Sequence, residues 1–255
     1  MRIALLADIH SNHIALNAVL NDLKTKNIGE VFFLGDYAFG GSGSVETVDI
    51  IMGYSDYPFK IIKGNKENYI EPIENNEACI FPEMRAIYNE LGSARIEWLK
   101  ALPAEIFVER GNKKLRLCHN PSSLRTFVVA DRLDRRNNYP NSETLERLSA
   151  DMAEDICIYG HYHLFMHETV NNKTFICPSA VGLPFTGDPR AQYVIIEIAE
   201  NNISCESCYV EYDYIGMLND FERKGYFSKY NNWALNTAIS MFTAKNYIGT
   251  NHRET

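Results

Sequence analysis

The sequence predicts an α/β fold made of two mixed β-sheets flanked by helices. Over roughly the first sixty residues, short apolar runs rich in Val, Ile and Phe alternate with segments of helical period, which is the βαβ order of a parallel sheet. Further along, tight-turn residues separate pairs of alternating runs, which predicts antiparallel hairpins. Since the chain needs both kinds of pairing, two mixed sheets explain the order better than a doubly wound Rossmann sheet.

The first part of the chain is expected to alternate strands with helices. Its strands are short runs of β-branched and aromatic residues, and its helices carry apolar residues three or four positions apart. Ser44 is a suitable cap for the second helix. The expected strands are 2–7, 30–34 and 59–63, and the expected helices are 13–26 and 44–52.

The rest of the chain mixes helices with antiparallel strands. The pairs Gly111-Asn112 and Asn171-Asn172 are typical of hairpin turns. Residues 83–101 are expected to form two helices, the second capped by Ser93. The other expected helices are 143–153, 214–224 and 232–242, and the later strands are 156–159, 191–199 and 203–212. No linker divides the chain, so we expect one domain, 1–255, with a core over 1–213 and a helical extension over 214–255.

Composition and charge exclude several classes of function. The net charge of −8 argues against binding to a nucleic-acid backbone. No apolar stretch approaches the roughly 18 residues that a membrane span requires, and the start MRIALLAD reaches an acid too soon for a signal peptide. The six cysteines are scattered, and Cys205 and Cys208 would point to opposite faces of a strand, which disfavours a metal or redox pair. We therefore expect no membrane contact and a reducing, cytoplasmic setting.

Polar side chains follow five of the predicted strands at the point where each strand ends, in the runs LLADIH, FFLGD, IIKGN, LRLCHN and CIYGHYH. In open α/β sheets the ligand site lies at the carboxyl ends of the strands, so these side chains should converge on one edge. The residues are Asp8, His10, Asp36, Asn65, His119, His161 and His163.

These residue types predict a metal centre. Two aspartates, one amide and four histidines are ligands suited to Mn, Fe, Zn or Ni. Seven ligands are too many for one ion, but with one bridging carboxylate they divide into two sets of four, which suits two ions about 3.5 to 4 Å apart. Taken singly, each aspartate could be a helix cap and His119 a core histidine, but caps have no reason to recur at successive strand ends.

The set D-x-H, G-D, G-N, H and G-H-x-H, in this order, resembles the calcineurin-like metallophosphoesterases over roughly residues 1 to 200. The run PSAVGLP is similar to a Gly-Ser-Val-Gly turn of that family, with Ala180 shifting the pattern. The resemblance implies a four-layer α/β/β/α sandwich and two divalent metal ions, Mn or Fe in the first place and Zn or Ni as alternatives. A hydroxide between the ions would attack the phosphorus of a small phosphorylated substrate.

The resemblance also assigns a role to each residue. Asp36 would bridge the two ions, and Asn12 would contact phosphate or lie directly behind the ligands. Asn65 and His119 would also take part in catalysis, together with Lys66. One ion would be held by Asp8, His10 and His163, and the other by Asn65, His119 and His161.

Lys66 departs from the family pattern, in which a histidine usually follows Gly-Asn and is thought to protonate the leaving group. A lysine beside two metal ions could hold a phosphate oxygen or, with a lowered pKa, act as an acid. The alternative is that Lys66 points to solvent, as most lysines do. A weaker acid favours leaving groups that need no proton, such as those of phosphoanhydrides.

The segment after His119 is rich in arginine. A basic lid there could clamp several phosphates, and Phe127 and Tyr139 could stack on a base. The same arginines could instead pair with Asp131 and Asp134 on the surface. The arginines are Arg125, Arg132, Arg135 and Arg136. Together with Lys66 they favour a nucleotide polyphosphate, such as diadenosine tetraphosphate, as substrate.

Three readings of the function stay open. The first is hydrolysis of phosphate esters or anhydrides, and the second is a phosphodiesterase or phosphoprotein phosphatase on the same metals. The third is a non-catalytic scaffold of the same fold, which the filling of every ligand position argues against. A homo-oligomer is also possible, and the helices from residue 214 onward are the expected place for a dimer contact or a cap over the site.

Overall fold

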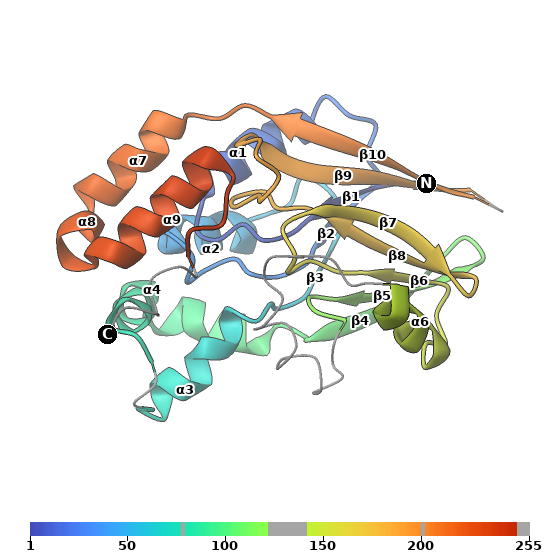
Figure 1. Cartoon of the computed structure of the whole chain (residues 1–255), viewed down its shortest axis with the longest axis horizontal. Coiled ribbons are helices and arrows are strands. Elements are labelled where there is room, and N and C mark those ends of the chain that lie inside the picture. The colour runs from blue at the N-terminus through green and yellow to red at the C-terminus, as the bar shows by residue number, and fades with distance from the viewer. Residues whose placement is uncertain (78–79, 122–141, 200–201, 249–255) are drawn as a thin grey trace.

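Two five-stranded β-sheets stand face to face in the centre of the molecule (Figure 1). The structure is a computed structural model, and it describes residues 1–77, 80–121, 142–199 and 202–248. The first sheet has the order β10-β9-β1-β2-β3, and the second has the order β4-β5-β6-β8-β7. The strands of the first sheet are β1 (Arg2–Leu6), β2 (Glu30–Phe33), β3 (Phe59–Ile61), β9 (Ala191–Ile198) and β10 (Ile203–Val210). Those of the second are β4 (Glu105–Arg110), β5 (Lys113–Cys118), β6 (Ile156–Ile158), β7 (Phe165–Val170) and β8 (Lys173–Pro178).

Both sheets are mixed, as the sequence predicts. In the first sheet β1, β2 and β3 are parallel, while β9 is antiparallel to β1 and to β10. In the second sheet β5, β6 and β8 are parallel, and the hairpins β4–β5 and β7–β8 supply the antiparallel pairs. The carboxyl ends of β1, β2 and β3 therefore lie at one edge of the first sheet, and those of β5 and β6 at one edge of the second.

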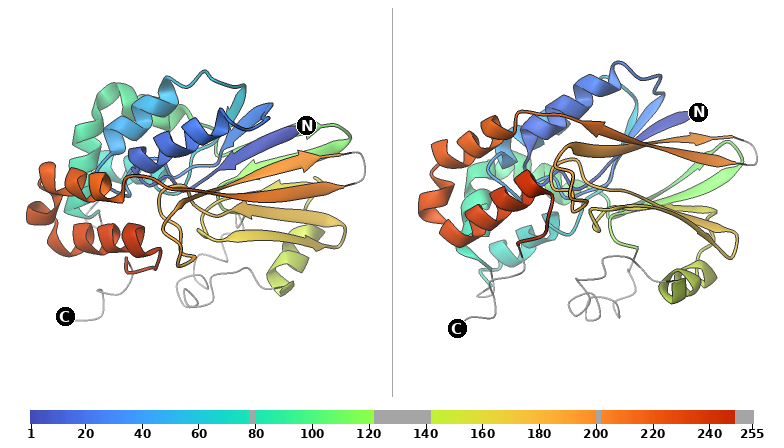
Figure 2. Two further views of the ribbon diagram at one scale, coloured as in Figure 1. Left: turned by 90° about the horizontal axis from the view of Figure 1, so that it is seen from above. Right: turned by 45° about the horizontal axis from the view of Figure 1, so that its top comes forward.

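The side chains of each strand alternate between two apolar layers. Ile3 and Leu5 of β1 join the core between the sheets, whereas Ala4 and Leu6 pack under helices. A third cluster lies on the outer face of the second sheet, under α6 (Ser142–Ala150). The predicted four-layer α/β/β/α sandwich is confirmed (Figure 2). The helices over the first sheet are α1 (His13–Leu23), α2 (Ser44–Met52), α4 (Pro82–Ala101), α7 (Tyr214–Arg223) and α9 (Asn231–Thr243).

Most predicted boundaries hold within a few residues, and the exceptions have local causes. The helical segment 82–101 breaks at Gly92, which has a φ of 69°, so two helices meet there as expected. The apolar character of the run 59–63 suggests a buried strand, but the strand at 59–61 lies at the edge of its sheet, and Phe59 is 36% exposed. Gly43, and not Ser44, caps α2, because the Ser44 hydroxyl forms a hydrogen bond with Ser11.

Three short helices of the described residues were not predicted from the sequence. They are a 3₁₀-helix, η1 (Glu67–Tyr69), and the α-helices α3 (Ile70–Glu74) and α8 (Tyr226–Lys229). A segment of three to five residues is too short to display a helical period, and its stability comes from tertiary contacts.

The extension after β10 packs on the helical side of the first sheet. Residues of α7 and α9 belong to the same apolar cluster as residues of α1 and α2, and Figure 1 shows α7, α8 and α9 beyond the ends of the strands. In β10, Cys205 packs against the core between the sheets, whereas Cys208 lies in the cluster under the helices, as predicted. Among the described residues, we find no helix of the length and apolar character that a membrane crossing demands.

Candidate metal centre

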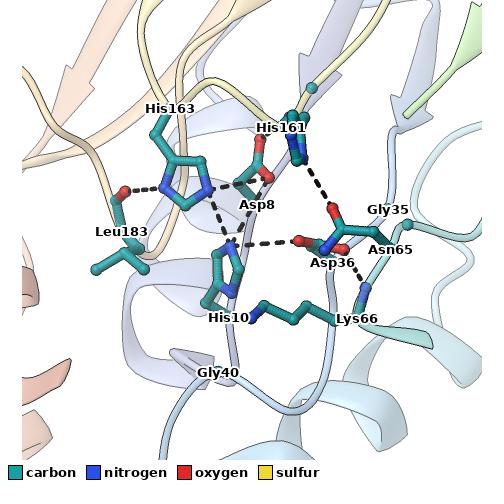
Figure 3. Close-up of polar contacts among 12 residues, drawn as sticks. Asp8, His10, Gly35, Asp36, Gly40, Asn65, Lys66, His161, His163 and Leu183 are labelled. Carbon is teal, nitrogen blue, oxygen red and sulfur yellow. Dashed lines mark hydrogen bonds and ion pairs between the residues drawn. The ribbon is translucent and has the colours of Figure 1, made fainter. Parts of the chain in front are cut away.

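The carboxyl ends of five strands bring the predicted ligands together (Figure 3). Three of these strands belong to the first sheet and two to the second, so the cluster lies where the two sheets meet. Every member contacts at least one other member within 4 Å. The members are Asp8, His10, Asp36, Asn65, His119, His161 and His163.

The first group of ligand atoms comes from Asp8, His10 and His163. His163 Nε2 lies 3.3 Å from Asp8 Oδ1 and 3.1 Å from His10 Nε2, and His10 Nε2 lies 3.7 Å from the same Asp8 oxygen. All three residues are buried, and one ligand atom of each lies within 4.8 Å of the others. This grouping has the composition that the resemblance assigns to one ion.

The second group surrounds Asn65. Its side-chain oxygen lies 3.0 Å from His119 Nε2 and 2.8 Å from His161 Nδ1. His119 also forms a buried three-residue group with Asp8 and Asp36, whose ligand atoms lie within 4.8 Å of one another. Asn65 thus contacts both imidazoles, and His119 links this group to the two carboxylates.

Both carboxylates lie between the two groups. Asp36 directs Oδ2 toward His10 Nε2, 3.6 Å away, and Oδ1 toward His119 Nε2, 3.4 Å away. Asp8 Oδ1 lies 3.8 Å from His119 Nε2 in addition to its contacts in the first group. Asp36 and Asp8 Oδ1 thus each face residues of both groups.

The strand ends turn sharply to present these side chains. A left-handed backbone costs a non-glycine residue about 1–3 kcal/mol, so it persists only where the surroundings fix it. The φ angles are 54° at Asp8, 49° at His10, 57° at Asp36, 76° at His161 and 61° at His163. Strained residues of this kind are concentrated at functional sites.

Two glycines allow the turns to approach one another. A Cβ atom on Gly64 would lie 2.2 Å from Asp36 Oδ1, and one on Gly40 would lie 2.5 Å from His10 Nδ1. Neither position can carry a side chain without moving a ligand. The glycine of the G-N motif is therefore a consequence of the close contact between the ends of β2 and β3.

Backbone carbonyls set the orientation of two ligand imidazoles. His119 Nδ1 donates to the carbonyl of Leu34, and His163 Nδ1 donates to that of Leu183. Because a carbonyl oxygen can only accept, the proton of each neutral ring is on Nδ1, and Nε2 offers its lone pair to the cluster. Phe185 stacks on the His163 ring at a centroid distance of 4.4 Å and limits its rotation.

The donor set fits divalent cations. Asp8 Oδ1 is buried and has no hydrogen-bond partner within the part of the chain that the structure describes. When the two rings are neutral, as metal binding requires, the lone pairs of His119 Nε2 and His163 Nε2 face carboxylate or amide oxygens that can themselves only accept. Buried acceptors that face one another without a proton between them repel, and a cation removes that repulsion.

The ionisation of the cluster reflects the same crowding. Burial raises the pKa values of Asp8 and Asp36, but neighbouring histidines outweigh it and hold both below the usual range. Burial lowers the pKa of His10 to about 4. At His119 burial also acts to lower the pKa, but Asp36 and Asp8 outweigh it and raise that pKa to about 10. Without a cation this ring therefore takes up a second proton, on Nε2, which a bound ion would replace. The carboxylates are thus ionised at neutral pH, and their negative potential favours cations.

Comparison with known proteins identifies the family. A model of the calcineurin-like phosphoesterase superfamily domain matches residues 1–201. The chain belongs to the calcineurin-like phosphoesterase superfamily. An uncharacterized protein of Methanocaldococcus jannaschii is 28% identical over 235 residues, which are 83% of this chain and 88% of that protein.

Two solved structures share the fold of this calcineurin-like phosphoesterase. A metallophosphoesterase from Sphaerobacter thermophilus has a TM-score of 0.70 at 20% identity, covering 96% of this chain and 99% of its own. A hypothetical protein from Pyrococcus horikoshii has a TM-score of 0.66 at 15% identity, covering 88% of this chain and 93% of its own. Each of the two structures covers a larger share of this chain than residues 1–213 make up. The fold similarity therefore includes part of the helical extension.

In this calcineurin-like phosphoesterase Lys66 lies on the rim of the cluster. Its backbone N–H donates to Asp36 Oδ1 at 2.8 Å, and its ammonium nitrogen lies 5.5 Å from the centre of the Tyr69 ring. The side chain is half-buried, and Figure 3 shows it extending from the Asp36 side of the cluster toward the His10 side.

Asn12 lies among the described residues, whereas the four arginines do not. Asn12 is 2% exposed, accepts a hydrogen bond from the Ala15 N–H at the start of α1, and donates to Gly182 O and Tyr212 Oη. Its amide therefore supports the turn behind the ligands. Arg125, Arg132, Arg135 and Arg136, with Phe127 and Tyr139, lie outside the described residues.

Sequence reasoning missed two residues that hold the ligand turns. Glu67 is 3% exposed, and its carboxylate accepts backbone hydrogen bonds from the turn that carries Asp36. The Tyr37 hydroxyl donates to Ile62 O and accepts from the Gly35 N–H at 2.9 Å, which ties the end of β2 to the end of β3. A single polar residue in a turn has no periodic signature, although the acid directly after Gly-Asn-Lys was the available signal.

Proposed function

We propose that this calcineurin-like phosphoesterase is a hydrolase that cleaves phosphate esters or anhydrides with two divalent metal ions, Mn or Fe in the first place. The observation that carries the proposal is the buried set of acceptors in which Asp8 Oδ1 has no hydrogen-bond partner among the described residues. An enzyme that needs cations for charge neutralisation requires such a set, whereas a purely structural core avoids it.

The chain would divide its ligands between the two ions. Asp36 would contact both, since its two oxygens face different histidines. When bound, the ions would lower the pKa of a water molecule and neutralise charge on the phosphoryl oxygens. The Lys66 ammonium, on the rim, would hold a phosphoryl oxygen as a point charge. Asp8, His10 and His163 would serve one ion, and Asn65, His119 and His161 the other.

The favoured substrates are nucleotide polyphosphates such as diadenosine tetraphosphate. A lysine is a weaker proton donor than a histidine at neutral pH, so leaving groups that depart as stable anions suit this site best. The arginine-rich segment after His119 supports the same class by its sequence. The five described cysteines are free, which supports a reducing, cytoplasmic setting.

An assay of metal-stripped protein tests the proposal. We expect no turnover of p-nitrophenyl phosphate, its bis ester or diadenosine tetraphosphate without metal, and recovery with Mn²⁺. Asp8→Asn should lower the recovered activity by at least about 100-fold, because a ligand is lost. The exposed Asp56, with 44% of its side chain accessible, provides the matched control Asp56→Asn, which should behave as wild type.

Each outcome of this assay has a distinct meaning. Turnover of the bis ester alone would favour a phosphodiesterase, and preference for the tetraphosphate would support the polyphosphate substrate. Metal binding without turnover of any of the three compounds, under any divalent metal, would refute the enzyme and favour a scaffold.

A further inference from the structure

Each oxygen of the Glu67 carboxylate accepts two hydrogen bonds from backbone N–H groups. Its Oε2 accepts hydrogen bonds from the N–H groups of Gly64 at 2.7 Å and Asp36 at 3.0 Å. Its Oε1 accepts from the N–H groups of Tyr37 at 2.8 Å and Ala38 at 3.2 Å. The side chain is buried in the first turn of η1, directly after Lys66.

These four donors belong to two separate strand ends. Three of them follow β2, in the turn that presents Asp36, and the fourth, Gly64, follows β3 and precedes the ligand Asn65. Because each carboxylate oxygen has two lone-pair directions, one glutamate can satisfy all four N–H groups at once. Glu67 therefore joins the turn of one predicted ligand to the turn of another.

The connection is reciprocal at Asp36. Glu67 accepts from the Asp36 backbone, while the Asp36 side chain accepts from the Lys66 backbone at 2.8 Å. The two turns are in van der Waals contact, since a Cβ on Gly64 would overlap Asp36. Asp36 has a φ of 57°, a conformation that surrounding bonds must fix. The position of its carboxylate thus depends on the bonds that Glu67 accepts.

We propose that Glu67 is a positioning residue that sets the metal affinity of the centre by fixing Asp36 and Asn65, without touching substrate itself. The inference rests on the proposed function only in that the cluster binds metal. The competing explanation is that Glu67 stabilises the fold and nothing more, as any buried hydrogen-bonded residue does.

Two substitutions at Glu67 and one control separate these explanations. Glu67→Gln keeps the shape but replaces one acceptor oxygen with an amide that donates, so one pair of backbone N–H groups faces a donor. Glu67→Asp keeps both acceptors on a shorter stem. Glu30→Gln is the matched control, because Glu30 is 4% exposed and pairs with Arg110 at the opposite end of β2, far from the cluster.

The measurement is Mn²⁺ affinity by calorimetry, at a temperature at which circular dichroism shows each variant to be folded. We expect Glu67→Gln to weaken Mn²⁺ binding by about 10- to 100-fold and Glu67→Asp by less. Glu30→Gln should lower resistance to urea and leave Mn²⁺ affinity unchanged. Wild-type affinity in Glu67→Gln would overturn the proposal. If that variant does not fold, Glu67→Asp decides in the same way.

Hydrogen exchange of the metal-free protein provides a second readout. In Glu67→Gln the backbone amides of residues 36–38 and of Gly64 should exchange faster, while those of the strand β9 keep their protection. Equal protection of these turns in wild type and variant would overturn the positioning role. If the wild type bound no Mn²⁺, the proposed function would fail, and the exchange data would still decide the role of Glu67.

Discussion

Lys66 is restrained at both of its ends. Its backbone donates to Asp36, and its ammonium group lies over the Tyr69 ring, an interaction worth about 0.5–1 kcal/mol at a partly exposed site. Tyr69 in turn packs edge-on against Phe39, which is fully buried. The ammonium group thus packs against an aromatic ring on the rim of the cluster, and a cation at that place can contact a phosphoryl oxygen.

Replacement of Lys66 should therefore affect turnover. We expect Lys66→Ala to lower kcat by at least about tenfold with Mn²⁺ bound, and Lys66→Arg to retain part of it, because the charge is kept. The control is Lys60→Ala, on the strand β3 but before the ligand turn. Steady-state kinetics with p-nitrophenyl phosphate and diadenosine tetraphosphate provide the measurement. Kinetics equal to wild type in Lys66→Ala would show that this lysine is a bystander.

At the scale of elements, α7 is fastened to the loop that precedes α2. The Ser42 hydroxyl donates to Asp220 Oδ2 at 2.8 Å, and Lys224, one turn later, donates to the Ser42 carbonyl at 2.8 Å and to Glu46. The neighbouring Gly40 lies directly against His10. The extension thus supports the loop behind the first group of ligands.

The charge of Asp220 should make this attachment dependent on pH. Burial raises the pKa of Asp220, but the Ser42 hydrogen bond and the charges of Lys224, Arg223 and His13 outweigh it and lower that pKa below the ordinary 3.8. A carboxylate with a depressed folded-state pKa stabilises the fold above its unfolded pKa. That contribution is lost as the pH falls below about 4, through the folded-state pKa.

Asp220→Asn should lower the free energy of unfolding by about 1–3 kcal/mol at pH 7, because buried donors lose a charged acceptor. The difference from wild type should shrink as the pH falls below about 4. Urea unfolding at pH 7, 5 and 3.5 measures this difference in the free energy of unfolding. Asp49, with a side chain 51% exposed beside Arg95, provides the control Asp49→Asn, with an expected effect below about 1 kcal/mol. A gap that stays constant from pH 7 to pH 3.5 would contradict this account.

At the scale of the molecule, the sequence predicted the sheets and their ligand edge because both depend on local patterns. Asp8, Asp36 and His119 each follow an apolar run, and parallel strands bring such ends together. Glu67 was not predicted, because its donors come from another strand end and only the tertiary fold brings them near. The edge position of β3 likewise depends on pairing that a single segment does not reveal.

The two sheets contribute to the centre in nearly equal parts. Asp8, Asp36 and Asn65 extend from strands of the first sheet, while His119 and His163 extend from strands of the second. Ligands from one sheet lie within 4 Å of ligands from the other. An ion bound by both would therefore stabilise the packing of the whole sandwich, in addition to any role in chemistry.

Mn²⁺ should therefore raise the thermal stability of the metal-free protein. At a free Mn²⁺ concentration of about 100 times the dissociation constant, binding adds about 2.7 kcal/mol, which corresponds to a rise in Tm of roughly 5 to 10 °C for a chain of this size. Asp8→Asn removes a ligand that extends from the first sheet, and His163→Ala removes one that extends from the second. Either change alone should abolish most of the rise in Tm. The exposed substitution Asp56→Asn should leave it intact. Scanning calorimetry with and without Mn²⁺ provides the measurement, and an equal rise in all four proteins would show that the ion binds elsewhere.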